Sequence, residues 1–225
     1  MQPIRLQPLG RTEPDDVGAS LADQPDSCAE DQATSLAIGL GANLGDPLAT
    51  LLAVRPLLEQ RLWRQRLLSG SSLRLRWSPL MQTEPVGGPA GQPPYLNAVL
   101  LVEGAAGPVD QVDAEVLLEE LQELEAFFGR RRCEHWGART LDLDLLWWGD
   151  LHVQMPHLVL PHPLLDQRSF VLAPLMALNP LMRVPAGLLS GGQTVQMVLN
   201  ALQPRLRERP PEVLDVSSLW GVDLA

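Results

Sequence analysis

Two aspartates spaced by one residue, Asp142 and Asp144, are the side chains in this sequence best suited to chemistry. Polar and apolar residues alternate from Thr140 onward, which predicts a strand with both carboxylates on one face and leucines on the other. The two Cα atoms would lie roughly 7 Å apart. Carboxylates this close disfavour joint ionisation unless a cation lies between them, and hard oxygen ligands suit Mg²⁺ better than Zn²⁺. We therefore predict a two-metal clamp; the alternative is the solvated face of an edge strand.

Basic residues gather just before this pair, in a chain whose formal net charge is −10. Arginine forks bind phosphate oxygens while carboxylates hold the accompanying Mg²⁺, so the combination favours phosphoryl transfer. All 17 of the lysine and arginine residues are arginine, which excludes a Walker-type phosphate loop and a lysine Schiff base. The cluster comprises Arg130, Arg131, Arg132, His135 and Arg139.

The residues around the pair read G-R-x-R, at 129–132, and then W-G-x-R-T-L-D-L-D-L-L, at 136–146. This resembles the signature of the 6-hydroxymethyl-7,8-dihydropterin pyrophosphokinase family, which transfers pyrophosphate from ATP to a pterin alcohol in folate biosynthesis, with AMP leaving. The resemblance spans about residues 36–202 in four motifs. It implies that Asp142 and Asp144 bind two Mg²⁺ ions that bridge the ATP phosphates, with Asp142 open to a second role as a base.

The same resemblance implies roles for the basic cluster. Arg132, Arg139 and Arg168 would neutralise charge in the transition state. Trp136 would help to close the arginine loop over the nucleotide. In this part of the chain two positions depart from the family pattern, with His135 where a permanent cation is common and Ala138 in place of proline. The residues implied to bind ATP are Gln122, Arg130, Arg132, His135, Trp136, Arg139 and His162.

A second motif lies in the Gly- and Pro-rich stretch 83–97, which is too long for a tight hairpin and predicts a functional loop between two strands. It resembles the family's T-x-P-x-G and Q-x-x-[FY]-x-N patterns, which line the pterin pocket. A side-chain amide offers a donor and an acceptor to a heterocycle edge, although Asn97 is equally compatible with an ordinary strand start. The resemblance implies pterin contacts from Thr83, Pro85, Val86, Tyr95, Asn97 and Phe170.

A third motif, P-H followed by R-x-F, covers 161–170. By resemblance His162 contacts the ATP phosphates, Arg168 acts on the transferred group and Phe170 stacks on the pterin, whereas a histidine between prolines and a phenylalanine on a helix are commonly structural. On the helix expected at 113–128, Gln122 is assigned to the nucleotide by resemblance. The physical expectation for Gln122 and Glu125, one turn apart on a surface helix, is solvation.

The fourth motif is the Gly-rich turn 39–47, which resembles the family's G-S-N-L-G-D with Ala42 in place of serine. Its alternative interpretation is a plain corner between a strand and a helix. Asp46 is expected to cap that helix, with Pro47 as its first residue and Pro56 kinking or interrupting it.

The expected elements follow the order β-α-β-β-α-β, which defines a ferredoxin-like α+β fold with an antiparallel sheet and helices packed on one face. Strand 71–81 is expected to be half-buried, with Arg74 and Arg76 on its polar side. The elements are strand 36–40, helix 47–62, strand 71–81, strand 97–102, helix 113–128 and strand 139–148, followed by helical patterns to 178 and over 193–202.

Length and composition place this domain between two appendages. The 225 residues, 45% hydrophobic and 20% charged, predict one globular domain at 35–203 without a membrane span. Residues 1–34 carry seven acids against two arginines and predict a loosely held acidic tail. Residues 204–225 form an extension to which we assign no function. Cys28 and Cys133 predict neither a disulfide nor a zinc site.

We expect a cytoplasmic monomer that binds neither nucleic acid nor membrane, because no secretory signal is apparent and the charge is acidic. Two other function classes remain open. A D-x-D glycosyltransferase would need a nucleotide-binding α/β domain before the aspartates, and the sequence shows none. A ferredoxin-like RNA-binding or sensor module would need exposed aromatic residues on its central strands.

Overall fold

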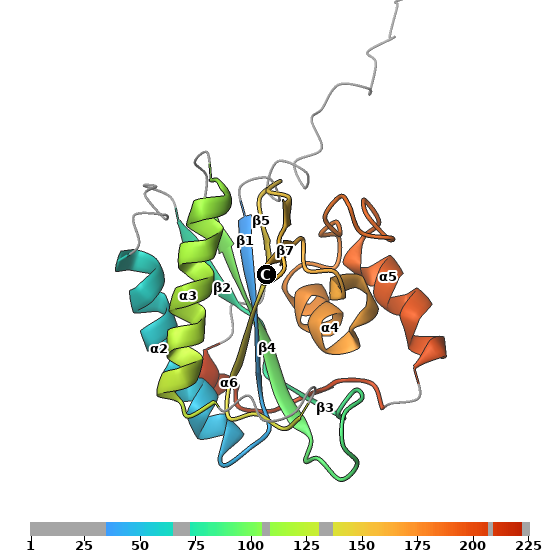
Figure 1. Ribbon diagram of the computed structural model, residues 1–225. Helices are drawn as coiled ribbons and strands as arrows, with labels where there is room; N and C mark the ends of the chain where they lie inside the picture. The colour runs from blue at the N-terminus through green and yellow to red at the C-terminus, as the bar shows by residue number, and fades with distance from the viewer. Residues whose placement is uncertain (1–34, 65–72, 105–108, 131–136, 207–208, 222–225) are drawn as a thin grey trace, which may run out of the picture.

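A computed structural model describes residues 35–64, 73–104, 109–130, 137–206 and 209–221. Within these residues the chain forms one antiparallel sheet of six strands in the order β5-β1-β4-β3-β8, with β2 also paired to β4 (Figure 1). A separate hairpin, β6–β7, follows β5. The strands are β1 (Ser35–Ala42), β2 (Arg74–Trp77), β3 (Met81–Thr83), β4 (Tyr95–Glu103), β5 (Asp142–Trp148), β6 (Val153–Gln154), β7 (Val159–Leu160) and β8 (Glu212–Val213).

The helices form two layers, one on each face of the sheet (Figure 1). α2 (Pro47–Arg64) and α3 (Gln111–Phe127) cover one face, and α4 (Ser169–Leu178) and α5 (Val195–Leu202) cover the other. The predicted ferredoxin-like α+β fold is confirmed, and the two helices of its β-α-β-β-α-β unit share one face as expected. α4 and α5 come after that unit and close the second face. No helix of the described part is both long and apolar enough to span a membrane.

Strand β1 lies inside the sheet, between β4 and β5. All its residues except Gly39 are buried, because helices cover both faces and its side chains enter two apolar clusters. At one end Ser35 pairs with Glu103, and near the other end Gly41 lies between Asn97 and Asp142. β1 therefore connects the end of the sheet where the described chain begins to the end that carries the predicted site.

The ends of the helices follow from local capping. The Asp46 carboxylate accepts the backbone N–H of Ala49 at 3.0 Å, which confirms the predicted cap of α2. Pro56 was expected to kink or interrupt this helix. It does not interrupt it, since α2 is continuous from Pro47 to Arg64, with the proline exposed. α3 starts at residue 111, two residues earlier than expected, because Asp110 and Asp113 form a reciprocal capping box.

The predicted strand 71–81 is not continuous: residues 71–72 lie outside the described residues, β2 ends at Trp77, and β3 begins only at Met81, after a bulge at 78–80. Pro79 has no N–H to donate, so the ladder with β4 cannot continue through it. Ser78 replaces the lost pairing, since its N–H donates to the Val99 carbonyl at 3.0 Å and its Oγ accepts the Val99 N–H at 2.9 Å. The pairing with β4 shifts by one residue across the bulge.

The expectation that this stretch is half-buried is wrong for Arg76, which is 6% exposed. Its guanidinium donates to Glu103 at 2.9 Å and to the Leu178 carbonyl at 2.7 Å. The alternating pattern correctly placed Arg76 and Trp77 on opposite faces, but α4 covers the face that we took to be solvated. Hydrogen bonds and an ion pair compensate for the burial of this cation.

The C-terminal segment 209–221 returns to the sheet, where Figure 1 shows it in red crossing from the α5 side past β3 to the α2 side. β8 pairs with β3 through Val213–Met81 and Glu212–Gln82. The helix α6 (Ser217–Trp220) follows, and Trp220 is 1% exposed. The extension to which the sequence assigned no function is therefore packed on the domain.

Candidate active site

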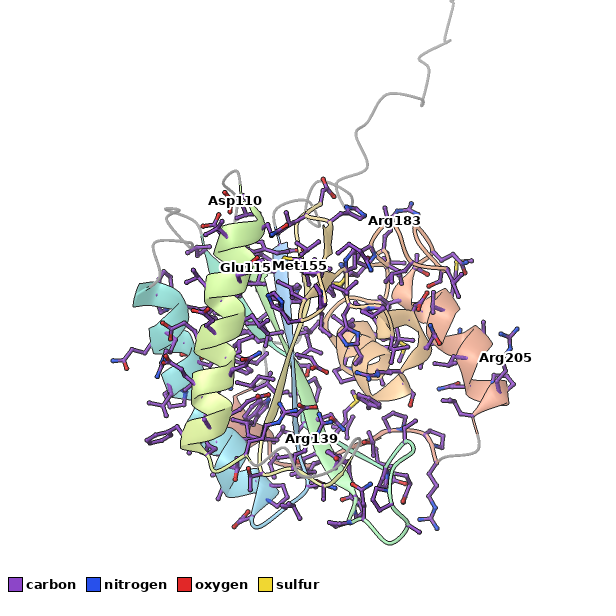
Figure 2. All side chains as sticks on the ribbon, viewed as in Figure 1. Asp110, Glu115, Arg139, Met155, Arg183 and Arg205 are labelled. Atoms are coloured by element: carbon purple, nitrogen blue, oxygen red, sulfur yellow. The ribbon has the colours of Figure 1, made fainter. Side chains whose placement is uncertain are left out.

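A cavity of about 450 Å³ lies beside β1, β4 and β5, at the end of β1 that bears Gly41. Its walls come from the two strands next to β1, the loop after β3, and the segment that leads into α4. Figure 2 labels Arg139 at this end of the sheet, near the loop after β3. The predicted site residues that line the cavity are Thr83, Pro85, Val86, Tyr95, Asn97, Arg139, Asp142, Asp144, His162, Arg168 and Phe170.

The carboxylates of Asp142 and Asp144 both face this cavity from β5, as their spacing predicts. They lie opposite glycines, because Asp142 pairs with Gly41 and Asp144 pairs with Gly39 across the β1–β5 ladder. The two β1 positions beside the aspartates therefore carry no side chain. β5 is an edge strand of the sheet, as the alternative interpretation assumed, but the face that carries the pair lines a cavity.

Three arginines surround the pair in the described residues. Arg139 and Arg130 lie 2.5 and 2.7 Å from the two oxygens of Asp142, and Arg168 lies 3.3 Å from Asp144. Burial and the negative charge of Asp142 raise the pKa of Asp144, and the arginines only partly oppose this. Among the described residues, Asp142 is thus paired with two arginines, whereas Asp144 has one, longer ion pair.

Glu125 is a buried carboxylate that the sequence analysis assigned to solvent, and that expectation is wrong. It lies on α3, accepts the backbone N–H of Leu143 at 2.7 Å and forms a close ion pair with Arg130. Burial raises its pKa to about 7, although the Leu143 N–H and Arg130 favour the ionised form. Arg130 also contacts Asp142. Glu125 therefore positions Arg130, and Arg130 in turn positions Asp142.

A polar and aromatic recess adjoins the carboxylates. Asn97 is 5% exposed and donates from Nδ2 to Thr83 Oγ at 2.7 Å. It is the third residue of β4 and lines the cavity, so it does more than begin a strand. The Tyr95 hydroxyl donates to the Gly137 carbonyl at 3.2 Å. Phe170 packs on the apolar cluster below α4 and also lines the cavity.

His162 is held in one tautomer by the backbone. Its Nδ1 accepts the N–H of Leu164 at 3.2 Å, so the proton of the neutral ring must lie on Nε2. Burial lowers the pKa of His162 to about 4, and the positive charge of Arg168 adds to the effect. The ring is therefore a neutral donor at physiological pH.

Asn43, in the Gly-rich turn, is a residue that the sequence analysis did not select. It is 2% exposed, its Oδ1 accepts the Arg139 N–H at 2.7 Å, and its Nδ2 donates to the Pro93 carbonyl at 3.1 Å. Its own N–H and that of Leu44 donate to the Arg139 carbonyl at 2.9 and 3.0 Å. The turn is therefore more than a corner, because it joins the loop after β3 to the start of the aspartate strand.

Some predicted residues lie elsewhere. Gln122 is half-buried on α3 and does not line the cavity. Arg130 does not line it either, but it contacts Asp142 as described. Arg132, His135 and Trp136 lie outside the described residues. Gln92, the first residue of the Q-x-x-[FY]-x-N pattern, also lines the cavity. Leu164 and Gln167 line it too, although no sequence argument selected them.

Phosphoryl-transfer enzymes commonly use carboxylates that share a divalent metal with the substrate. They also use guanidinium groups that bind the phosphate oxygens of the substrate, and both kinds of group are present here. On a ferredoxin-like sheet, this end of the molecule therefore has the chemistry of a phosphotransferase. The chain belongs to the 7,8-dihydro-6-hydroxymethylpterin-pyrophosphokinase family, whose model matches residues 37–180.

Curated relatives agree with this assignment. The 2-amino-4-hydroxy-6-hydroxymethyldihydropteridine pyrophosphokinase of Pseudomonas aeruginosa is 38% identical over 150 residues, which cover 67% of this chain and 83% of the relative. The enzyme of the same name from Haemophilus influenzae is 38% identical over 138 residues, 61% of this chain and 77% of the relative. That of Synechocystis is 31% identical over 185 residues, 82% of this chain and 78% of the relative.

Proposed function

We infer that this protein transfers pyrophosphate from ATP to 6-hydroxymethyl-7,8-dihydropterin, giving AMP and the pterin pyrophosphate in folate biosynthesis. The observation that carries this is the joining of two environments in one cavity. The Asp142–Asp144 pair with its arginines suits a metal-bound polyphosphate, and the recess at Asn97 and Thr83 suits a flat heterocycle. Family membership supports the same reaction.

We propose that Asp142 and Asp144 hold Mg²⁺, as two ions. Mg²⁺ in proteins is commonly held by one or two carboxylates together with substrate phosphates, which matches this donor set. The described residues contain no group of three or more His, Cys, Asp or Glu side chains that could hold a metal, so phosphate and water oxygens would have to complete the coordination. When bound, Mg²⁺ would neutralise the phosphate oxygens and make the β-phosphorus more electrophilic.

The arginines would change partners when ATP binds. Arg139 and Arg168 now neutralise the two aspartates, and a guanidinium released from a carboxylate can make charge-assisted hydrogen bonds to phosphate oxygens. Neutral His162 would donate from Nε2 to a further phosphate oxygen. Arg130 would stay with Glu125, which preserves one cation beside Asp142. We propose that Arg132, His135, Trp136 and Gln122 act on the nucleotide, as the family resemblance implies.

The pterin would occupy the recess. Asn97 carries a donor and an acceptor for the heterocycle edge, and its position is fixed by Thr83. Phe170 and Tyr95 would pack against the ring system, and Pro85 and Val86 would border it.

In the reaction, the pterin hydroxymethyl oxygen would attack the β-phosphorus, forming a new P–O bond as the bond from the β-phosphorus to the oxygen bridging it to the α-phosphorus breaks. AMP leaves with that bridging oxygen, and the hydroxyl proton passes to an ionised carboxylate of the pair. Arg139 and Arg168 would stabilise the charge that moves onto the leaving group. The contribution of the chain is mainly positioning and electrostatics.

The two other classes receive less support. A sheet-face RNA reader needs one open face of its sheet, and here helices cover both faces. A D-x-D glycosyltransferase would leave the amide and aromatic recess beside the aspartates without a function. We also propose that the protein is a cytoplasmic monomer that does not bind nucleic acid. The net charge of −10 supports the last point, and sedimentation would test the monomer.

The decisive experiment is incubation of the purified protein with ATP, Mg²⁺ and 6-hydroxymethyl-7,8-dihydropterin, followed by separation of the nucleotides. Formation of AMP with an equal amount of pterin pyrophosphate, dependent on the pterin, is the expected result. Formation of ADP, or AMP release that ignores the pterin, would overturn the proposal. A parallel reaction with a nucleotide sugar and Mn²⁺ tests the glycosyltransferase alternative.

A further inference from the structure

The C-terminal segment 212–221 lies against the back of the wall to which we assign pterin binding. We propose that this segment positions that wall, with Trp220 as its principal positioning residue. The inference rests on the proposed function and deepens it, since it identifies a part of the chain that controls affinity for one of the two substrates.

The anchor of the segment is a cluster around Trp220. Its ring meets that of Trp77 edge-on, with centroids 5.3 Å apart and planes at 81°. The Arg55 guanidinium lies 4.8 Å from the Trp77 ring and 5.3 Å from the Trp220 ring, and it donates to the Gly221 carbonyl at 2.8 Å. Glu59 accepts from both Trp77 Nε1 and Arg55. The cluster therefore ties α6 to both α2 and β2.

From this anchor, two hydrogen bonds reach the bulge between β2 and β3. Trp220 Nε1 donates to the Ser78 carbonyl at 2.7 Å, and the Leu214 N–H donates to the Leu80 carbonyl at 2.8 Å. These carbonyls lie on either side of Pro79. The C-terminal segment thus contacts the bulge on one side. On the other side, β4 contacts it through the hydrogen bonds between Val99 and Ser78.

The bulge in turn sets the position of the cavity wall. Asn97, Ala98 and Val99 line the cavity from the part of β4 that faces the bulge and the start of β3. β3 has only three residues and ends at Thr83, whose hydroxyl accepts the Asn97 amide. Without β8, β3 would be an edge strand paired on one side alone, and the residues that fix Asn97 would lose their outer support.

The test compares Trp220→Phe and Trp220→Ala with the parent by calorimetry. The probes are an ATP analogue with Mg²⁺, and then 6-hydroxymethylpterin added to that complex. Trp220→Phe keeps the aromatic packing but loses the N–H, so the Kd for the pterin should rise about fivefold. Trp220→Ala also loses the ring contact, and the Kd should rise by more than about tenfold. The Kd for the ATP analogue should stay within about twofold, since its proposed contacts do not adjoin the bulge.

Two control variants separate positioning from loss of stability. Trp63→Ala removes a tryptophan that is 54% exposed on α2, and Val198→Ala weakens the buried face of α5 away from the cavity. Both should bind the pterin as the parent does when each protein is measured well below its own melting temperature. Amide hydrogen exchange within β3, Met81–Thr83, should be faster in Trp220→Phe than in either control.

Each outcome has a definite meaning. Selective loss of pterin affinity in the Trp220 variants supports the proposal. Parental pterin affinity in both variants, or an equal loss for the ATP analogue, overturns it while leaving the proposed function intact. A parent that binds the ATP analogue but not the pterin overturns the proposed function itself.

Discussion

Asp142 and Asp144 differ in their electrostatic surroundings although they share one strand face. Asp142 contacts two arginines, whereas Asp144 contacts one at a longer distance and has a raised pKa. A raised carboxyl pKa means that the ionised form is less favourable in the folded state than in water. The fold therefore carries an unfavourable charge at Asp144 that a bound cation would relieve.

Asp144→Asn should lower kcat by at least about a thousandfold, because the variant loses a charged oxygen needed for the metal. Its melting temperature should be unchanged or slightly higher, since the disfavoured charge is removed. Steady-state kinetics with Mg²⁺ and thermal unfolding at pH 7.5 measure the two effects. Asp150→Asn, at an exposed turn, is the matched control and should behave as the parent. Near-parental turnover in Asp144→Asn would refute the metal role.

His162 makes stability depend on pH in a predictable direction. Its pKa is about 6.5 in the unfolded chain and about 4 in the fold, so between these values the unfolded state binds more protons. This contribution to stability is complete above pH 6.5 and is lost as the pH falls toward 4, up to about 3 kcal/mol. His162→Gln should therefore lose less stability than the parent between pH 7 and pH 4.5 in urea unfolding. Identical losses would mean that the folded ring ionises normally.

At the scale of elements, the glycines of β1 set how much room the site has. A Cβ at Gly41 would lie 2.9 Å from Asn97 Oδ1, which is too close, whereas a Cβ at Gly39 would meet only ordinary contacts of 3.5 Å or more. Gly41→Ala should displace the Asn97 amide and raise KM for the pterin about tenfold. Gly39→Ala is the matched control and should change it by less than about threefold. Equal effects in the two variants would contradict the role given to Asn97.

Much of the site could be predicted from sequence because its parts are local patterns. The alternation at 140–146 placed both aspartates on one strand face, and that face does line the cavity. The loop between β3 and β4 was recognised by its length and its glycines and prolines. Eleven of the residues assigned through motifs line one cavity, although their roles remain proposals.

What the sequence could not predict depends on contacts between distant segments. The position of Glu125 in the helical pattern predicts a surface residue. It is buried because α3 packs against β5, where the Leu143 N–H donates to its carboxylate. Asn43 forms hydrogen bonds to residues 50 and 96 positions away in the sequence. Local patterns of polar and apolar residues do not reveal contacts between such distant segments. Arg76 was placed on a polar face because α4, which covers that face, comes much later in the chain. β8 has two residues, too few for a strand pattern.

At the scale of the whole molecule, a single sheet contributes side chains to two apolar clusters. The cluster under α2 and α3 and the cluster under α4 and α5 lie on opposite faces of the same strands. β1 and β4 contribute side chains to both. Neither helical layer can therefore lose its contacts without exposing strands that the other layer needs.

The described domain should accordingly unfold as one cooperative unit. Leu121→Ala in α3 and Leu172→Ala in α4 remove fully packed side chains from opposite clusters, and each should cost about 2–5 kcal/mol. In both variants, tryptophan fluorescence and far-ultraviolet circular dichroism should give coincident transitions in urea. Separate transitions for the two probes in either variant would show that the layers unfold independently.

The direction of β1 has a practical consequence for handling this protein. Ser35 and Gly41 are separated by six residue steps of extended chain, about 20 Å, so the chain enters the sheet well away from the cavity. A dye or linker attached at Ser35 would therefore lie at the opposite end of β1 from the cavity. An attachment at Gly221 would lie next to the cluster around Trp220 and could disturb the hydrogen bond between Arg55 and the Gly221 carbonyl. Attachment at the Ser35 end of β1 is therefore preferable to attachment at Gly221 for immobilised assays.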